Sequence, residues 1–233
     1  MIRGYQMIYQ QDEEELLNFA RKMFTFFSMQ KIILGTFIMF VYNNVPFTNY
    51  IKSNFFIFAI SAFILLTVLF MVHIALDFVR KPPQSYVCYF MFTLSECWVV
   101  AFILATTDGS TVFLFTSTVT GMVMAISLFL NTNTLNWLRG VFALSLMLAF
   151  MFFLSVMTLN YADLVTIMVC MVGGLMFGIF LLSKAFQLLQ GKYSHNLTKE
   201  DYVIGSLTVY ADFGFVLLLM LFIMLAMIKS FLS

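Results

Sequence analysis

Long apolar runs, each about the length of one membrane crossing, follow one another along most of the chain. A helix needs about 20 apolar residues to cross the hydrocarbon core of a bilayer, and the pattern predicts seven such helices. Their expected limits are Met23 to Tyr42, Asn54 to Leu76, Tyr86 to Ala105, Thr111 to Leu130, Val141 to Leu159, Leu164 to Leu189 and Val203 to Ile228. Polar or turn-forming stretches such as Asn43-Asn44-Val45-Pro46 and Lys81-Pro82-Pro83-Gln84 separate the runs, and proline interrupts the hydrogen bonds of a helix. The pattern therefore predicts an all-α integral membrane protein, a bundle of seven transmembrane helices.

The composition agrees with this pattern. The chain has 233 residues, of which 62% are hydrophobic and 10% charged, and its mean hydropathy is +0.98, far above that of a soluble domain. Because the runs leave only short loops, we expect one membrane domain over residues 23–233, preceded by a cytosolic N-terminal segment over residues 1–22. A net charge of +1, with basic residues scattered over the loops, argues against a nucleic-acid partner. The lipid bilayer is the partner that the composition predicts.

Basic residues are shared unevenly between the two sides of the predicted bundle. One side carries Arg3, Arg21, Lys22, Arg80, Lys81, Arg139, Lys192 and Lys199, whereas the other carries Lys52 and Lys229. Cytosolic loops hold the excess of lysine and arginine in membrane proteins. We therefore expect a cytosolic N-terminus and, after seven crossings, a lumenal or extracellular C-terminus. The sequon Asn196-Leu197-Thr198 then faces the cytosol and should carry no glycan.

The segment before the first run has its own helical pattern. From Asp12 to Phe24 the acidic residues come first, Arg21 and Lys22 come near the end, and apolar residues recur at helical spacing. Charges in this order suit the dipole of a helix. Two arrangements fit: a separate short helix lying in the membrane interface, or an extension of the first transmembrane helix.

Four ionisable residues fall inside the predicted spans: Lys31, His73, Glu96 and Asp212. A charge at the bilayer centre costs about 2.5 to 3.5 kcal/mol on insertion scales, so such residues face the bundle interior or a water-filled cavity and mark candidate functional sites. If Glu96 and Asp212 lack a cationic partner, burial disfavours their charged forms, and a proton-sensitive gate becomes one hypothesis. Lys31 lies within reach of the cytosolic end, so we expect its ammonium to extend to the interface. His73, near the same end, is expected to be a satisfied core or interface residue and not a ligand.

Other kinds of site find little support in the sequence. Cys88, Cys97 and Cys170 lie in apolar runs and are expected to behave as small hydrophobic residues. No histidines or inward cysteines have metal-ligand spacing, so we expect no fixed metal site and no cofactor. The intramembrane-protease elements Gly-x-Gly-Asp and Gly-x-Ser-Gly do not occur, and no acid–base pair can be placed on one helix face, so we do not expect an enzyme. The last span has no internal lysine to bind retinal, which disfavours a light-driven protein.

Two glycines in the sixth run, Gly174 and Gly178, are four residues apart. Small residues at this spacing let two helices approach closely. We expect them to serve packing within the bundle, with contacts in a homo-oligomer as the alternative.

Four segments of the chain resemble one known family. They are Phe19-Ala20-Arg21-Lys22-Met23-Phe24 followed by Gln30, Phe92-Thr93-Leu94-Ser95-Glu96, Gly173 to Phe180 with Gln187-Leu188-Leu189, and Asp201-Tyr202 through Tyr210-Ala211-Asp212. These resemble the Arg-Lys-Val-Tyr and glutamine opening, the Phe-Thr-Leu-x-Glu segment, the sixth span, and the Glu-Tyr and Leu-Tyr-Leu-Asp segment of the Bax inhibitor motif family. The similarity is greatest to its Golgi anti-apoptotic protein and Lifeguard branches, and it implies a seven-helix bundle of the Bax inhibitor type.

The resemblance also implies a function. Members of this family are described as calcium-permeable leaks of the endoplasmic reticulum or Golgi membrane that lower stored calcium and inhibit apoptosis. For this chain it implies Ca²⁺ as the permeant ion, apoptosis-regulating membrane proteins as further partners, and the plasma membrane as an alternative location. In the family, one carboxylate in the sixth span and one in the seventh share a proton and gate the pore with pH. Asp212 matches the second acid, and Glu96 and Arg80 are further candidate pore or gate residues.

The first acid of that pair is missing from this chain. With Gln187 as the reference point, the family's aspartate falls at Ala185, and Lys184 stands just before it. Lys184 would then reach toward Asp212 as a salt bridge, and gating by pH would be altered. The loss keeps a second interpretation open, a regulator of cell death that acts through protein partners without conducting ions. Either way the chain resembles a divergent member of the family.

Overall fold

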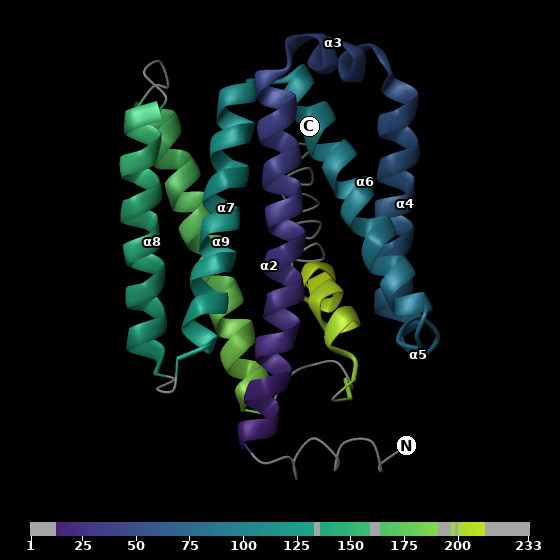
Figure 1. Ribbon diagram of the computed structural model, residues 1–233, viewed down its shortest axis with the longest axis vertical. Coiled ribbons are helices and arrows are strands. Elements are labelled where there is room, and N and C mark those ends of the chain that lie inside the picture. Colours follow the sequence, from purple (N-terminus) through teal and green to yellow (C-terminus); the bar gives the residue numbers. More distant parts are fainter. Residues whose placement is uncertain (1–12, 133–135, 159–163, 191–196, 199, 213–233) are drawn as a thin grey trace, which may run out of the picture.

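The computed structural model describes residues 13–132, 136–158, 164–190, 197–198 and 200–212. Regular secondary structure in these ranges is helical (Figure 1). The helices are α2 (Glu13–Asn43), α3 (Val45–Ser53), α4 (Phe55–Ile74), α5 (Leu76–Val79), α6 (Gln84–Thr106), α7 (Gly109–Leu130), α8 (Trp137–Thr158) and α9 (Leu164–Leu189). A further helix covers residues 202–212.

Six of the described helices are long and apolar enough to cross a membrane: α2, α4, α6, α7, α8 and α9. They overlap the first six predicted spans, although α2 begins ten residues before the predicted Met23, and this confirms an all-α protein of the multi-pass membrane type. The seventh predicted span, Val203 to Ile228, begins in the 202–212 helix, and the rest of it lies outside the described residues. The seventh crossing therefore stays a prediction.

Helix α2 runs without a break through the proposed boundary between residues 22 and 23. Of the two arrangements open for this segment, the structure has the helical extension of the first span. The extension is anchored by packing, because Ala20, Met23 and Phe24 are fully or almost fully buried. Arg21 also donates a hydrogen bond from Nε to the Leu130 carbonyl oxygen at 2.8 Å, which satisfies a carbonyl at the C-terminal end of α7 that has no partner within the helix.

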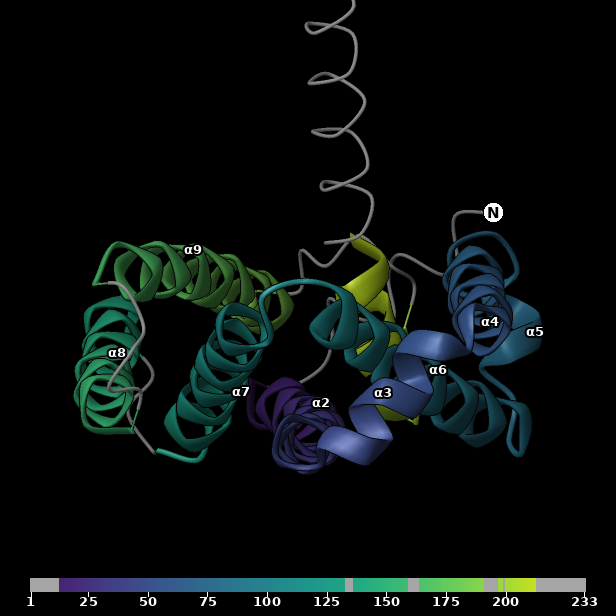
Figure 2. The ribbon, with the colours of Figure 1, turned by 90° about the horizontal axis from the view of Figure 1, so that it is seen from above.

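The stretch from Asn43 to Pro46, predicted to separate two spans, contains the end of α2 at Asn43, and helix α3 begins directly after it at Val45. The Asn44 side chain accepts a hydrogen bond from the Phe47 backbone amide at 3.1 Å, and proline occupies the first turn of the helix. Proline is well tolerated there because its missing N–H would have no partner in any case. The prediction counted Pro46 only as a helix breaker and so missed α3, which crosses one end of the bundle between α2 and α4 (Figure 2).

Helix α7 begins at Gly109, with Asp108 as its N-cap residue. The Asp108 carboxylate accepts hydrogen bonds from the hydroxyls of Thr111 and Ser110 and from their backbone amides. The hydrogen bond from the Thr111 hydroxyl has the largest effect and that from the Ser110 hydroxyl the next, and together they hold the pKa of Asp108 below its usual value. An aspartate cap is favourable because it satisfies backbone amides that have no partner within the helix.

The bundle has a packed centre and two lipid-exposed flanks. Helix α7 contacts α2, α6, α8 and α9. Half of the residues in the most apolar stretch of α7 are buried, whereas 17% of those in the corresponding stretches of α4 and α8 are buried. Figure 2 shows α4 and α8 on opposite sides of the bundle. The 202–212 helix is enclosed, because residues 203–209 and 211 are all buried. Its side chains contact α2, α6 and α9.

Candidate functional site

Within the described part of the chain, two lysine–carboxylate ion pairs lie inside the bundle. Lys31 Nζ on α2 lies 2.5 Å from Glu96 Oε1 on α6, and Lys184 Nζ on α9 lies 2.7 Å from Asp212 Oδ2 on the 202–212 helix. Both acids singled out in the sequence therefore have a cationic partner. Each pairs with a different lysine, and the charges cancel within each pair.

The Lys31–Glu96 pair is the deeper of the two. Lys31 is 4% exposed and Glu96 is 9% exposed. The expectation that Lys31 extends its ammonium to the membrane interface is therefore wrong. A long side chain reaches the interface only when nothing nearby attracts its charge, and here a carboxylate on the neighbouring helix does so at much shorter range.

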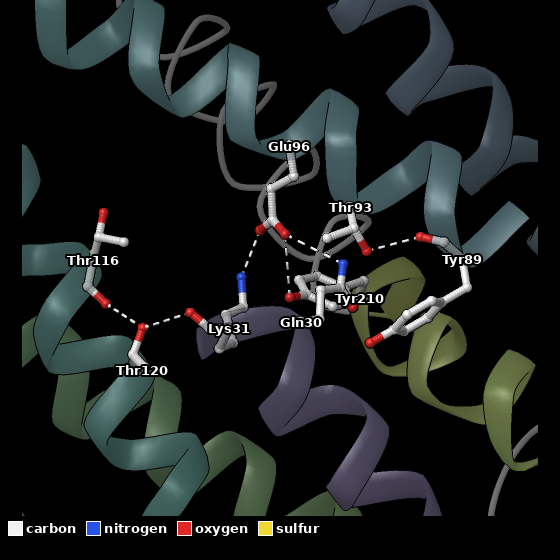
Figure 3. A network of polar contacts seen from close by, with 8 residues as sticks. All are labelled: Gln30, Lys31, Tyr89, Thr93, Glu96, Thr116, Thr120 and Tyr210. Carbon is white, nitrogen blue, oxygen red and sulfur yellow. Dashed lines mark hydrogen bonds and ion pairs between the residues drawn. The ribbon is translucent and has the colours of Figure 1, made fainter. Parts of the chain in front are cut away.

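Glu96 accepts hydrogen bonds from two further side chains (Figure 3). Gln30 Nε2 donates to Glu96 Oε2 at 3.3 Å, and the Tyr210 hydroxyl donates to the same oxygen at 3.4 Å. The Lys31 ammonium lies 4.5 Å from the centre of the Tyr210 ring, within the range of a cation–π contact. A buried charge is tolerated when it is both paired and hydrogen-bonded, and the carboxylate of Glu96 meets both conditions.

Tyr210 is positioned by aromatic packing. Its ring centre lies 4.7 Å from that of Phe27 on α2 and 4.9 Å from that of Phe92 on α6. Helix α7 joins the same region, because Thr120 Oγ1 contacts the Lys31 carbonyl oxygen at 3.3 Å (Figure 3). The cluster therefore ties together α2, α6, α7 and the 202–212 helix.

The Lys184–Asp212 pair is partly buried, with side-chain exposures of 17% and 14%. The contact confirms the hypothesis that Lys184 reaches Asp212. Ala185, the position where the resemblance would require the first acid, is 0% exposed and belongs to the main hydrophobic core. In place of two carboxylates, this part of the bundle has one carboxylate and one ammonium.

The 202–212 helix connects the two ion pairs. Tyr210 and Asp212 are two residues apart, which is about 200° around a helix axis, so they reach different neighbours. Tyr210 contacts Glu96 on α6, and Asp212 contacts Lys184 on α9. A rotation or shift of this one helix would disturb both pairs together.

A cavity of about 350 Å³ adjoins the deeper pair. Lys31 and Glu96 form part of its wall, and Thr111 and Thr116 on α7 contribute hydroxyl groups. Thr111 is in the first turn of α7, so the cavity extends from the buried pair toward the end of the bundle where α6 meets α7. The rest of its wall is apolar, from residues Leu34, Val100, Ile103, Val112, Phe115 and Val119.

Other residues named from the sequence lie elsewhere. Arg80 pairs with Asp77 and, with Glu200 and Asp201, borders a separate cavity of about 190 Å³ beside the start of the 202–212 helix. His73 is exposed on α4. Among the described residues no group of three or more histidine, cysteine or acidic side chains is arranged to hold a metal ion. Cys88, Cys97 and Cys170 are free thiols.

Gly174 and Gly178 both face other helices of the bundle. A Cβ atom at Gly174 would overlap the Cγ2 methyl of Thr118 on α7. At Gly178 a Cβ atom would lie 3.1 Å from Leu144 Cδ2 on α8 and 3.4 Å from Met122 Cγ on α7. The glycines therefore allow α9 to approach α7 and α8, which agrees with the expected packing role.

Gly174→Ala is expected to destabilise the protein by about 1 to 3 kcal/mol, the usual cost of overpacking a core. Thr118 is fully buried, and its hydroxyl donates to the Leu114 carbonyl oxygen at 2.9 Å, so it cannot turn away without losing that bond. Gly178→Ala is the matched control, because the flexible side chains of Leu144 and Met122 can adjust. Thermal unfolding in detergent micelles measures both, and an equal loss for the two variants would contradict the assignment.

These observations define the chain as a multi-pass α-helical membrane protein with two ion pairs inside its helix bundle. Comparison with family models, with curated proteins and with solved structures finds no match to this chain in any of the three.

Proposed function

We propose that this protein is a calcium leak channel, or a channel-like modulator of stored calcium, of the Bax inhibitor motif type, and that it inhibits apoptosis. The observation that carries the proposal is the 2.7 Å contact between Lys184 and Asp212. Lys184 is next to Ala185, the position at which the family resemblance implies the first of two proton-sharing carboxylates, and Asp212 matches the second. In this chain the gate is an acid–base pair instead of an acid pair.

In the closed state the Lys184 ammonium neutralises Asp212 and holds the 202–212 helix against α9. When the pair separates, the carboxylate becomes available to a passing cation, and carboxylate oxygens are the ligands that Ca²⁺ prefers. The contact of Tyr210 with Glu96 links this movement to the cavity beside Lys31. That cavity provides an approach for ions from the end of the bundle near Thr111.

Gating should depend only weakly on pH. Two carboxylates in contact hold one proton between them and respond when it is lost. A carboxylate paired with an ammonium has no shared proton of this kind. We therefore expect similar calcium flux at pH 6 and at pH 8, in contrast to a two-carboxylate gate.

The test is calcium flux into proteoliposomes that contain the purified protein, measured with an enclosed calcium indicator at pH 6 and pH 8. Wild-type protein should conduct at both pH values, and Asp212→Asn should reduce the flux several-fold because the pore loses its carboxylate. Asp77→Asn is the matched control, since it makes the same change at an exposed side chain and should leave the flux unchanged. Equal flux through wild type and Asp212→Asn would refute the role of Asp212.

A second function, a regulator that binds membrane partners without conducting, is favoured by the charge balance of the site. Glu96 and Asp212 are each neutralised by a lysine, which is an unusual lining for an open cation pore. If proteoliposomes show no flux, and cells expressing Asp212→Asn are still protected from apoptosis, this second function is the correct one.

The proposed location is the Golgi or endoplasmic reticulum membrane, with the plasma membrane as the alternative, a cytosolic N-terminus and a lumenal C-terminus. Five basic residues lie toward the side of the bundle at which α2 starts: Arg21 and Lys22 in the N-terminal third of α2, Arg80 and Lys81 after α5, and Arg139 in the first turn of α8. Lys52 lies on α3 at the other side (Figure 1). This asymmetry supports the orientation through the positive-inside rule. A mobility shift on glycosidase treatment, from a glycan at Asn196, would reverse it.

A further inference from the structure

A groove of about 870 Å³ runs between α7 and α8, on one of the two flanks of the bundle that are least buried. Two small residues, Ala125 on α7 and Ala143 on α8, leave the space open. Larger apolar side chains form its walls, and three of them on α8 are strongly exposed: Phe142 at 69%, Leu146 at 63% and Phe150 at 55%. In a membrane this groove faces the lipid.

The groove has a polar end and an apolar end. Arg139 and Thr132 line it where α7 ends and α8 begins, and Phe150 lines it farther along α8. Phe150 is eleven positions after Arg139 in α8, which is about 16 Å along a helix axis. The hydrocarbon core of a bilayer is about 30 Å thick, so the groove spans about one leaflet, with its cationic end at the membrane surface.

We propose that this groove is a binding site for an anionic phospholipid. One acyl chain lies along Ala125 and Ala143, and the acidic headgroup is held by the Arg139 guanidinium, because the Thr132 hydroxyl already donates to the Phe129 carbonyl oxygen at 2.7 Å. Arginine suits a phosphate because its planar fork can donate two parallel hydrogen bonds. Basic pockets between transmembrane helices are known to hold acidic lipid headgroups. Lipid binding here does not depend on whether the protein conducts calcium.

The charge around the polar end strengthens this assignment. Arg21 lies at the same end, because its Nε donates to the carbonyl oxygen of Leu130, two residues before Thr132. The positive field of Arg21 and Arg139 favours a lipid with net negative charge over a zwitterionic one.

The lining also distinguishes a lipid from a protein occupant. An extended peptide in this groove would leave most of its backbone N–H and C=O groups without partners, because polar side chains occur only at one end. A transmembrane helix would span both leaflets, whereas the groove covers one. An acyl chain with an acidic headgroup matches both the length and the distribution of polarity.

Quenching of a single tryptophan by brominated lipid tests the proposal. The reporter protein carries Trp98→Phe, Trp137→Phe and Phe142→Trp, which places the one tryptophan in the groove. It is reconstituted into phosphatidylcholine nanodiscs with a small fixed fraction of chain-brominated phosphatidylserine or, separately, chain-brominated phosphatidylcholine. We expect the anionic lipid to occupy the groove about fivefold more readily, the preference that one nearby basic residue provides.

Three further variants and a second reporter provide the controls for this test. Arg139→Gln should strongly reduce the preference and leave only the weaker contribution of Arg21, whereas Lys81→Gln, which removes a charge at the same end but outside the groove, should preserve it. A second reporter with its tryptophan at Phe70, exposed on α4 at a similar depth, should show no preference. Ala143→Phe should fill the groove and reduce quenching of the Phe142→Trp reporter by both lipids.

Equal quenching by the two lipids in the parent reporter would overturn the proposal, since it would indicate ordinary bulk lipid. A preference that is undiminished in Arg139→Gln would also overturn it. Unchanged quenching after Ala143→Phe would place the lipid outside the groove, which contradicts the proposed position of the acyl chain.

Discussion

Lys31→Met should destabilise the folded protein by about 3 to 5 kcal/mol, because it leaves the Glu96 carboxylate buried without its cation. Glu96 is 9% exposed and lies on a helix packed against α2, α4 and α7, so it cannot reach solvent without disrupting the bundle. The remaining donors, Gln30 and Tyr210, are neutral and at 3.3 and 3.4 Å. They cannot compensate for a full charge.

A double-mutant cycle shows whether this loss comes from the pair. Glu96→Met should also be strongly destabilising, because it strands the Lys31 ammonium. The double variant Lys31→Met/Glu96→Met removes both charges and should be much less destabilised than the sum of the single variants. Thermal unfolding in detergent micelles measures all four proteins, with Lys52→Met as a control for removing a lysine at the surface of α3. Additive losses would show that the two side chains do not interact.

The second large effect is expected at Lys184. If the Lys184–Asp212 pair holds the pore closed, Lys184→Met should raise calcium flux into proteoliposomes by about fivefold or more. This magnitude reflects the attraction between unit charges about 4 Å apart, which is about 1 kcal/mol in water and larger in a less polar environment. A change of about 1.4 kcal/mol alters an equilibrium about tenfold.

Lys184→Arg is the matched control for this prediction, since it keeps a cation that can contact Asp212. Its flux should stay near the wild-type value. Combining Lys184→Met with Asp212→Asn should remove the gain, because the carboxylate that attracts the cation is then absent. Equal flux through Lys184→Met and Lys184→Arg would show that the ion pair does not close the pore.

Of the two interior ion pairs, one could be predicted from the sequence and the other was not. The pairing of Lys184 with Asp212 could be anticipated, because the resemblance aligned the sixth and seventh spans and showed a lysine beside the missing acid. The Lys31–Glu96 pair was missed although the sequence held a signal. Lys31 and Glu96 lie at similar distances from the starts of the first and third spans, and both spans start on the same side. Two opposite charges at one depth are candidates for a pair, but depth alone does not show that the two helices face each other.

Tyr210 and α3 were missed for different reasons. Tyrosine is common in apolar runs, so the sequence does not single out Tyr210. Its position depends on the packing of its ring against Phe27 on α2 and Phe92 on α6. Helix α3 was missed because proline near Asn44 was interpreted only as a break. In the structure Asn44 caps a helix that has proline in its first turn. In a sequence, an asparagine followed by a proline can mark either the end of one helix or the start of another, and only the nine residues of α3 itself distinguish the two.

The order of apolar and polar residues was enough to define a membrane protein with helices at nearly the observed limits. Insertion into a bilayer depends on the hydrophobicity of about 20 consecutive residues, which is a local property that needs no knowledge of neighbours. Which charges meet is not local. Lys31 and Glu96 are 65 residues apart, and their contact depends on how α2 and α6 are rotated and spaced, which is set by the packing of α7 and the 202–212 helix around them. The same packing leaves the groove at Arg139 open, because Ala125 and Ala143 come together there only after α7 and α8 have associated.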